Sequence, residues 1–341
     1  MEYKYNNLSI NDNFSLTICC ITYNLHGESL DFIQINQLLI SHKKRSCDIY
    51  AISTQESQRS ILMNLFFWDK SKFEEDLARF FGVNYVRLKT ETLGGIHLII
   101  FIKKIHKNFI LNYYKEYIKT GFYGLLGNKG AVGIGFKLYN ISFLMINCHL
   151  CTGFENSIYR NDDFDYIKKN IHPNLNKVDI VIWMGDFNYR VNMTMEEVEE
   201  IMKNKEDLKL IEFDQMNHEI ENYNLKCAGF KEGKIEFLPT YKYSDDDRNI
   251  LICDSLDHIP SYTDRILYMI NENKFNLITY EINEDNNKNE IIESEVENIN
   301  IQKNEKDKVK GSFQLLNYNS MQDIVFSDHK PVCAYFNLNI N

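Results

Sequence analysis

The sequence of 341 residues lacks the features of a membrane-spanning or secreted protein. No apolar run approaches the roughly 18 residues that a spanning helix needs, and Met1–Asn13 is polar, without the apolar core of a signal peptide. Asn337–Asn341 forms no lipidation motif. The 8 cysteines are irregularly spaced, which is typical of reduced thiols and not of a disulfide framework. These absences predict a cytoplasmic protein.

Basic residues are also in short supply. The chain has 38 Lys and Arg against 48 Asp and Glu, a formal net charge of −10 at pH 7. Proteins that bind nucleic acid usually carry a basic surface, so the balance argues against a nucleic-acid partner. An anionic substrate would need a local basic pocket or a metal ion. With 44% hydrophobic and 25% charged residues, the composition is that of a folded globular protein.

Strand-like and helix-like segments are mixed along the whole chain, which predicts an α/β fold. The expected strands cover Leu16–Asn24, Asp48–Glu56, Ile96–Ile102, Ala131–Leu138, Ile141–His149, Val178–Asp186, Arg265–Ile270, Phe275–Ile282 and Val332–Leu338. The expected helices cover Leu30–Leu39, Lys72–Phe81, Glu155–Asn170, Met195–Asn204 and Glu206–Phe213. The Asn/Glu/Lys-rich stretch at about 281–310 predicts a flexible insertion between two strands. Nothing else resembles a linker, so we expect residues 1–341 to form a single domain.

Residues capable of chemistry stand at the ends of several apolar strands. Some strands end in such a residue and others begin directly after one, so a shared rim requires strands of both directions, that is, a mixed sheet. The expected rim cluster is Asn24, Glu56, His149, Asp186, Asn188, Asp264, Asp328 and His329. Taken singly, each of these residue types is more often a turn or surface residue. Carboxylates and amides without thiolates favour a hard cation such as Mg²⁺.

Two motifs closely resemble the signatures of the inositol polyphosphate 5-phosphatases: WMGDFNYR at Trp183–Arg190 and PSYTDRIL at Pro260–Leu267. The other matching segments follow in the order TYNLHG at Thr22–Gly27, Gln55-Glu56, GNKGAV at Gly127–Val132, HLCTG at His149–Gly153, RNDDF at Arg160–Phe164, GFKEG at Gly229–Gly233, PTYKY at Pro239–Tyr243 and SDHKPV at Ser327–Val332. The resemblance covers roughly Leu16 to Leu338. The Asp-x-Asn and Ser-Asp-His elements are shared with the wider DNase I-like superfamily, whereas the Asn-Tyr-Arg and Asp-Arg-Ile-Leu boxes are specific to the phosphatases.

The resemblance implies a four-layer α/β/β/α sandwich with two mixed β-sheets face to face, the DNase I-like fold. It implies Mg²⁺-dependent removal of the 5-phosphate from phosphoinositides, PI(4,5)P2 or PI(3,4,5)P3, or from soluble Ins(1,4,5)P3 or Ins(1,3,4,5)P4. It also implies peripheral contact with membranes, and we expect a monomer by default.

Catalytic roles follow from the same resemblance. Asp186 would orient and deprotonate the attacking water, steadied by Asn188. His329, paired with Asp264, would act on the phosphoryl oxygens as an imidazolium or strong donor, and His149 would contact the same phosphate. Such roles suit phosphoryl transfer, in which catalysis is mostly positioning and charge neutralisation.

Metal and substrate contacts are implied at nine further positions. The metal positions are Glu56, as the Mg²⁺ ligand, with Asn24 close by and Asp328 as a further candidate for the metal shell. The implied substrate contacts are Asn128, Lys129, Tyr241, Lys242, Arg190 and Arg265. Asn128 and Lys129 belong near the 1-phosphate, and Tyr241 and Lys242 belong near the 4-phosphate. The two arginines either contact a phosphate or anchor the signature loops.

Two positions depart from the family pattern. The family usually places Lys or Arg just ahead of the proline of the second signature, where the side chain helps to grip the 4-phosphate. Here the sequence reads Leu256-Asp257-His258, and the nearest certain cation is Arg248. The aromatic-Cys pair of the signature is replaced by Tyr262-Thr263, which should not affect activity because that cysteine is not catalytic.

An apolar loop, GFYGLLG, covers Gly121–Gly127. It is either a buried loop or, as the family implies, a membrane contact through Phe122, Leu125 and Leu126. The lysines at 103, 104 and 107 are near in sequence and favour docking on an anionic membrane surface.

Two other functions remain open on the sequence. A metal-dependent endonuclease of the same superfamily would use the same metal, aspartate and histidine, but the net charge and the two phosphatase boxes argue against it. A catalytically inactive phosphoinositide-binding relative is the second alternative. Against it, every expected catalytic position is occupied.

Overall fold

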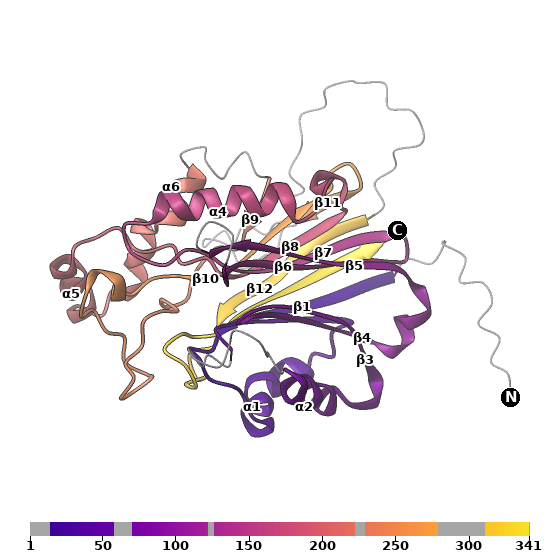
Figure 1. Cartoon of the computed structure of the whole chain (residues 1–341), viewed down its shortest axis with the longest axis horizontal. Coiled ribbons are helices and arrows are strands. Elements are labelled where there is room, and N and C mark those ends of the chain that lie inside the picture. Colours follow the sequence, from indigo (N-terminus) through magenta and orange to yellow (C-terminus); the bar gives the residue numbers. More distant parts are fainter. Residues whose placement is uncertain (1–13, 58–69, 122–125, 222–228, 279–310, 341) are drawn as a thin grey trace, which may run out of the picture.

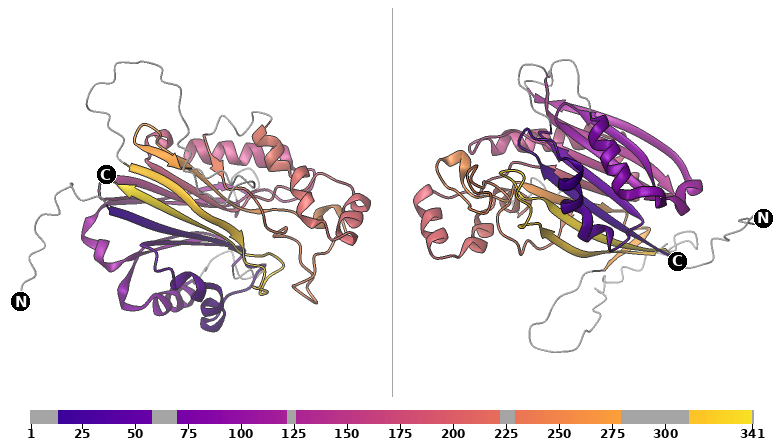
Figure 2. Two further views of the ribbon diagram at one scale, coloured as in Figure 1. Left: turned by 180° about the vertical axis from the view of Figure 1, so that it is seen from behind. Right: turned by 90° about the horizontal axis from the view of Figure 1, so that it is seen from below.

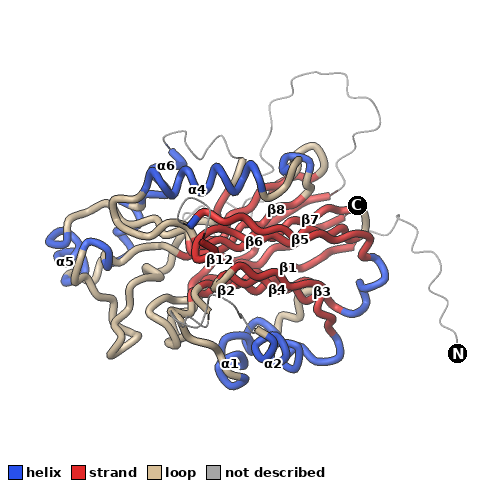
Figure 3. The backbone as a smooth tube through the Cα atoms, viewed as in Figure 1, coloured by secondary structure: helices blue, strands red, loops and turns tan. Residues whose placement is uncertain are grey.

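The computed structural model describes residues 14–57, 70–121, 126–221, 229–278 and 311–340. Two β-sheets lie face to face in the middle of the molecule, and helices cover their outer faces (Figures 1 and 3). This arrangement confirms the predicted four-layer sandwich with two mixed sheets. No helix among the described residues is long and apolar enough to cross a membrane.

The first sheet has seven strands in the order β11-β12-β13-β1-β2-β4-β3. Its strands are β1 (Phe14–Asn24), β2 (Ile49–Gln55), β3 (Tyr85–Leu93), β4 (Ile96–Lys103), β11 (Phe275–Ile278), β12 (Gly311–Ser320) and β13 (Val332–Ile340). β1 runs parallel to β2 and antiparallel to β13. The segment 279–310, which includes the predicted insertion, joins β11 to β12 and lies outside the described residues.

The second sheet has six strands in the order β5-β6-β7-β8-β10-β9. Its strands are β5 (Ile110–Thr120), β6 (Leu126–Leu138), β7 (Ile141–His149), β8 (Ile180–Asp186), β9 (Lys231–Glu232) and β10 (Asp264–Ile270). β7 and β8 are parallel, and β10 is antiparallel to β8 with Asp264 opposite Asp186. Both sheets are therefore mixed, as the rim argument requires.

The helices divide between the two outer faces. On the first sheet lie α1 (Phe32–Lys43) and α2 (Ser71–Phe81), seen clearly from below in Figure 2, and over the second sheet lie α4 (Ser157–Asn170) and α6 (Gln215–Glu221). The fifth helix, α5 (Met195–Lys203), stands at the loop-rich end of the sandwich. The short 3₁₀ helices are η1 (Gly82–Asn84), η2 (Lys104–Phe109), η3 (Leu175–Lys177), η4 (Asp207–Phe213) and η6 (Leu256–His258).

Local sequence sets the ends of the helices. α1 begins at Phe32 because Asp31 and Gln34 form a reciprocal capping box, so it starts two residues after the predicted helix. α5 has the same device in Thr194 and Glu197. The segment predicted as a helix at Glu206–Phe213 is instead the 3₁₀ helix η4.

Three apolar cores hold the layers together. The largest lies between the sheets, one lies under α1 and α2, and one lies under α4. Along β8 the side chains alternate between cores: Ile182 and Met184 face the inter-sheet core, whereas Val181 and Trp183 face the core under α4. This alternation is the period of two of a β-strand, and it also decides where the polar residues at the strand ends point.

Candidate functional site

Strand alternation brings four predicted site residues to one rim between the sheets. Asn24 on β1 and Asp186 on β8 share the parity of inter-sheet core residues such as Cys20 and Met184. His149 on β7 and Asp264 on β10 likewise follow the inward-facing residues of their strands. The inward parity explains why side chains from both sheets meet: the Nδ2 of Asn24 donates to Oδ2 of Asp186 at 2.8 Å.

Asp186 lies at the centre of this rim and is 1% exposed. Besides Asn24, the backbone N–H of Asn188 donates to its Oδ1 at 3.0 Å, and His149 Nε2 is 3.4 Å from its Oδ2. Asn188 has a φ of 58°, a left-handed turn that brings its N–H back onto the carboxylate. Burial, followed by the charge of Asp264, raises the pKa of Asp186 to about 6. The carboxyl group of Asp186 therefore gains or loses its proton close to neutral pH.

His329 and Asp264 form a buried pair next to Asp186. The Nδ1 of His329 is 2.8 Å from Oδ2 of Asp264, which also accepts from the hydroxyls of Thr240 and Thr263 at 2.8 and 2.9 Å. Burial alone would lower the pKa of His329, but the charge of Asp264 raises it to about 9. At pH 7 the imidazole is therefore protonated. Thr240 and Thr263 were not predicted, although Thr263 directly precedes Asp264 in the signature.

The carboxylates of this rim fit a hard divalent cation. Carboxylate oxygens of Asp186 and Asp264 lie within 4.8 Å of each other and of a ring nitrogen of His329. The protonated imidazole of His329 offers no lone pair to a cation, so the two carboxylates are the ligands that this cluster could supply. Oδ1 of Asp264 is buried without a hydrogen-bond partner among the described residues, and the charge of Asp264 contributes to the raised pKa of Asp186. A cation would relieve this repulsion between two buried carboxylates. Oxygen donors without thiolates are the set that Mg²⁺ and Ca²⁺ prefer.

Glu56 follows β2 at the same rim, in a backbone conformation that the fold enforces. Its φ is 51°, and its carbonyl accepts from the N–H of Gly27 at 2.9 Å. A Cβ on Gly95 would come 3.1 Å from Cα of Glu56, so glycine permits this close approach. The carboxylate reaches His149, with 3.7 Å between Oε1 and Nε2.

The residues of the GNKGAV segment lie beside His149. The Nζ of Lys129 is 2.5 Å from Nε2 of His149, and burial lowers the pKa of Lys129 to about 8. Asn128 is exposed near the start of β6. In the apolar loop, Phe122 and Leu125 lie outside the described residues, as does the side chain of Leu126.

The PTYKY segment packs directly on the His329 pair. The ring centroid of Tyr241 lies 4.6 Å from that of His329, and the Arg190 guanidinium lies 4.5 Å from the Tyr241 ring. Arg190 donates to Oδ1 of Asn188 and to the carbonyl of Asp257, both at 2.9 Å. Arg190 therefore ties the first signature to the segment that carries Tyr241, which is an anchoring arrangement.

Asp328 is surrounded by basic side chains. Lys242 Nζ and His26 Nδ1 each lie 3.2 Å from its carboxylate, and Arg248 Nη1 lies 4.0 Å away. Asp328 does not belong to the cluster formed by Asp186, Asp264 and His329. His26 and Arg248 were not predicted as site residues, because each lies in a loop whose partners are distant in sequence.

Arg265 lies away from the side chains of this rim. It is next to Asp264 on β10, so its side chain points to the opposite face of the sheet. Its guanidinium is 0% exposed and pairs with Asp214 at 2.7 Å and Glu232 at 2.5 Å. Arg265 is therefore an anchor for the outer layer. Of the two roles that the sequence allowed for Arg265, phosphate contact or anchor, these ion pairs favour the anchor.

The lysines at 103, 104 and 107 also lie away from the site. They follow β4, whose Ile102 pairs with Ile49 at the start of β2, whereas the site is at the end of β2. These lysines therefore lie at the opposite end of the sandwich from Glu56 and Asp186.

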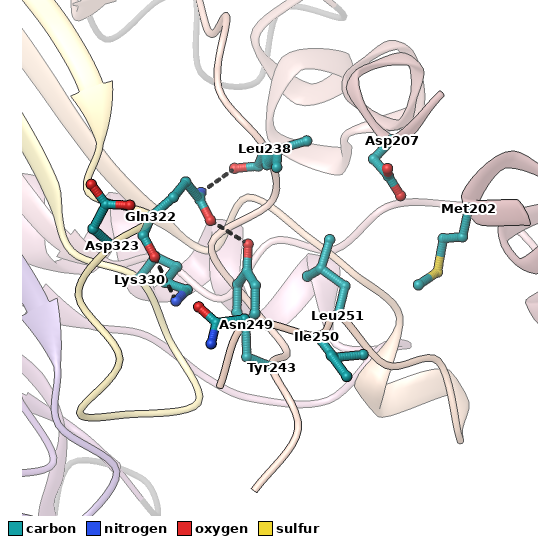
Figure 4. A pocket seen from close by; sticks show the side chains of 10 residues that line it. All are labelled: Met202, Asp207, Leu238, Tyr243, Asn249, Ile250, Leu251, Gln322, Asp323 and Lys330. Atoms are coloured by element: carbon teal, nitrogen blue, oxygen red, sulfur yellow. Dashed lines mark hydrogen bonds between the residues drawn. The ribbon is translucent and has the colours of Figure 1, made fainter. Parts of the chain in front are cut away.

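A separate cavity of about 470 Å³ lies beside Tyr243, the last residue of the PTYKY segment (Figure 4). It is lined in part by Tyr243, Lys330 and the carboxylates of Asp207 and Asp323. Lys330 donates to the carbonyls of Gln322 and Ile324 at 2.8 and 3.1 Å. None of the predicted site residues lines this cavity, and its two carboxylates disfavour an anionic ligand.

Comparison with known proteins gives consistent matches over nearly the whole chain. The profile of the endonuclease/exonuclease/phosphatase family 2 matches residues 21–335. Synaptojanin-2 of Homo sapiens is 31% identical over 300 residues, 84% of this chain and 19% of that protein. Phosphatidylinositol 4,5-bisphosphate 5-phosphatase INP51 of Saccharomyces cerevisiae is 32% identical over 261 residues, 74% of this chain and 23% of that protein. The chain thus spans about a fifth of the length of these relatives.

A solved structure extends the match to three dimensions. It is the inositol polyphosphate 5-phosphatase domain of Spsynaptojanin, in complex with inositol (1,4)-bisphosphate and a calcium ion. The TM-score is 0.74 at 27% identity, and the match covers 96% of this chain and 86% of that one. Together with the sheet order, this match confirms the predicted fold and the family resemblance read from the two signatures.

Proposed function

Because the chain belongs to the endonuclease/exonuclease/phosphatase family 2 and, within it, to the inositol polyphosphate 5-phosphatases, we propose that it removes the 5-phosphate of phosphoinositides or soluble inositol polyphosphates, with Mg²⁺ as cofactor. The candidate substrates are PI(4,5)P2, PI(3,4,5)P3, Ins(1,4,5)P3 and Ins(1,3,4,5)P4. One observation carries the proposal: a buried carboxylate with a pKa of about 6 adjoins a buried histidine with a pKa of about 9. Such a pair offers a base and a charged donor at the same pH.

Asp186 is the base in this proposal. A general base works best when its pKa lies near the working pH, and burial brings Asp186 into that range. Asn24 and the N–H of Asn188 fix the orientation of its carboxylate. Asp186 takes a proton from water as the water oxygen bonds to phosphorus and the bond from phosphorus to the ester oxygen on C5 of the inositol breaks. That ester oxygen leaves as the 5-hydroxyl group, with its proton supplied by solvent water.

His329 is the donor to the transferred phosphoryl group. Its Nδ1 is held by Asp264, which leaves the Nε2 side of the ring to donate to a phosphoryl oxygen. The charge on the imidazolium is maintained by Asp264 and is available where negative charge develops. His149, beside Asp186 and Lys129, is placed to contact the same phosphate.

Glu56 and Asn24 are the residues that would hold Mg²⁺. When bound, the ion neutralises charge on the phosphate and polarises it. One carboxylate is enough, because Mg²⁺ keeps several waters and takes substrate oxygens as ligands. Asp328 stays outside the proposed metal shell, because its carboxylate is already paired with the Lys242 ammonium.

Substrate contacts complete the proposal. Asn128 and Lys129 bind toward the 1-phosphate, and Tyr241 and Lys242 bind toward the 4-phosphate. Arg190 positions Asn188 and Tyr241. The apolar loop makes a peripheral membrane contact, and the protein works in the cytoplasm as a monomer.

The proposal is tested by phosphate release from a matched panel. The panel holds soluble inositol phosphates and short-chain phosphoinositides, each with and without the 4-phosphate and the 5-phosphate. Wild type, Asp186→Asn and an EDTA control are compared. Release only from 5-phosphorylated members, lost in the variant and in EDTA, supports the proposal. No release from any member, combined with cleavage of abasic-site DNA, would favour the endonuclease alternative.

A further inference from the structure

The guanidinium of Arg248 lies beside the site and has donor capacity left. Its Nη2 is paired with Oδ1 of Asp245 at 2.6 Å. Its Nη1 is buried without a hydrogen-bond partner among the described residues, and Oδ1 of Asp328 lies 4.0 Å away. A buried charged donor without an acceptor is unfavourable. It is therefore a place where an anionic oxygen would be stabilised.

Three basic side chains gather around Asp328. Its one carboxylate is shared by Lys242, His26 and Arg248. This cluster adjoins the reaction site, because Asp328 precedes His329 and Lys242 follows Tyr241, whose ring packs on His329. An anionic group of the substrate that lies next to the scissile phosphate would therefore meet the unpartnered Nη1 of Arg248 and the Lys242 ammonium.

Leu256, Asp257 and His258, which precede Ile259 and the proline of the second signature, offer no free basic group to such an anion. Leu256 is apolar and 46% exposed. Asp257 is acidic, and its Oδ1 accepts from the N–H of Phe154 at 2.7 Å. The ring of His258 is engaged by Asp254, with 2.5 Å between Nδ1 and Oδ1.

The two arginines of the signatures are committed elsewhere. Both Nη atoms of Arg190 donate within the protein, one of them to Asn188. Arg265 is buried between Asp214 and Glu232. Arg248 differs from these two arginines in two ways. Its side chain is 21% exposed, and its Nη1 has no hydrogen-bond partner among the described residues.

We propose that Arg248, with Lys242, binds the phosphate that neighbours the scissile one on the inositol ring, the 4-phosphate. Arg248 thereby replaces the cation missing from Leu256–His258. This inference rests on the proposed function and assigns a specificity-determining residue to it. Asp245 holds the guanidinium through Nη2 and leaves Nη1 for the substrate.

The test compares kcat/KM for Ins(1,4,5)P3 and Ins(1,5)P2, which differ only in the 4-phosphate. A hydrogen bond to a charged group is worth about tenfold to hundredfold in binding. We expect Arg248→Gln to lower the ratio of the two kcat/KM values by about that factor, and Arg248→Lys to have an intermediate effect. The matched control is Arg79→Gln, the same chemical change on the outer helix α2, which should leave the ratio unchanged.

Calorimetric titration separates this inference from the proposed function. Ins(1,4)P2 and Ins(1)P are titrated into wild type and Arg248→Gln in the presence of Mg²⁺. Weaker binding of Ins(1,4)P2 alone in the variant supports the role of Arg248 even without turnover. Hydrolysis by wild type with an unchanged ratio in the variant, or an equal loss on both substrates, would overturn the role of Arg248 and leave the phosphatase proposal intact.

Discussion

The Nδ1 of His329 lies 2.8 Å from Oδ2 of Asp264, and the two residues are 65 positions apart in the chain. Both are buried at the rim between the sheets. Burial opposes a charge on the imidazole, and the adjacent carboxylate more than offsets that effect, so the pKa of His329 is about 9. The pairing therefore decides the protonation state of the donor at neutral pH.

Replacing Asp264 by Asn should move the alkaline limb of the pH–rate profile. In wild type, kcat/KM falls as His329 loses its proton around pH 9. Without the carboxylate, burial lowers the pKa of His329, so the fall should begin at or below neutral pH. The measurement is kcat/KM from pH 5 to 10 for both proteins. An alkaline limb at the same pH in both would show that this pair does not control the reaction.

Asp186→Asn should be less active and more stable than wild type. Loss of a general base typically lowers kcat by about 10²–10⁴-fold. The folded-state pKa of Asp186 is raised to about 6, so charging this group destabilises the fold as pH rises from about 4 through 6. The variant avoids that cost and should gain about 1–3 kcal/mol at pH 7. The measurement is urea unfolding of both proteins in EDTA at pH 4 and pH 7. A variant that is no more stable than wild type at pH 7 than it is at pH 4 would contradict this expectation.

Glu56→Gln should abolish the stabilisation of the protein by Mg²⁺. An ion that binds only the folded state stabilises it by about 2.7 kcal/mol at a hundredfold excess over its Kd. We expect Tm to rise with Mg²⁺ in wild type and to stay constant in the variant. This readout needs no turnover. The same rise in both proteins would place the ion away from Glu56.

Arg265→Met should destabilise the fold, consistent with an anchoring role. It would leave the carboxylates of Asp214 and Glu232 buried without their partner. Breaking a buried ion pair in this way costs about 3–5 kcal/mol. The control is Arg79→Met on the outer helix, with an expected loss of about 0.5–1 kcal/mol from its contact with the Phe32 ring. A stable variant with a raised KM would instead restore Arg265 as a substrate contact.

Glycine substitution of Phe122, Leu125 and Leu126 should separate lipid from soluble substrates. Apolar side chains that enter a membrane contribute to turnover only when the substrate is in a bilayer. We expect turnover of PI(4,5)P2 in vesicles to fall and turnover of Ins(1,4,5)P3 to stay near wild type. Equal losses on both would indicate that the loop supports the fold.

The parts of the fold that could be predicted are those with a continuous apolar run. β8 is buried throughout, and β7 coincides with its predicted range, Ile141–His149. β3 and β5 were not predicted, because both are edge strands with many polar and half-exposed residues. β12 was also missed, since its sequence mixes apolar residues with Asn, Gln and Ser.

The candidate site divides in the same way. Strand ends predicted the rim, because polar residues stand at the ends of apolar strands. The parity of Asn24, Asp186 and Asp264 within their strands explains why these side chains point between the sheets. The same parity places Arg265 on the opposite face, so its position outside the rim can also be read from the sequence. The contacts of Arg248 with Asp328 depend on how a loop folds over the sheet, and no local pattern encodes them.

The most direct test of the central claim is the identity of the phosphate that is removed. Ins(1,4,5)P3 is incubated with wild-type protein and Mg²⁺, and the product is identified by phosphorus NMR. We expect Ins(1,4)P2 as the sole bisphosphate, with none formed by Asp186→Asn. Formation of Ins(1,5)P2 or Ins(4,5)P2 by the wild type, or no product at all, would contradict it.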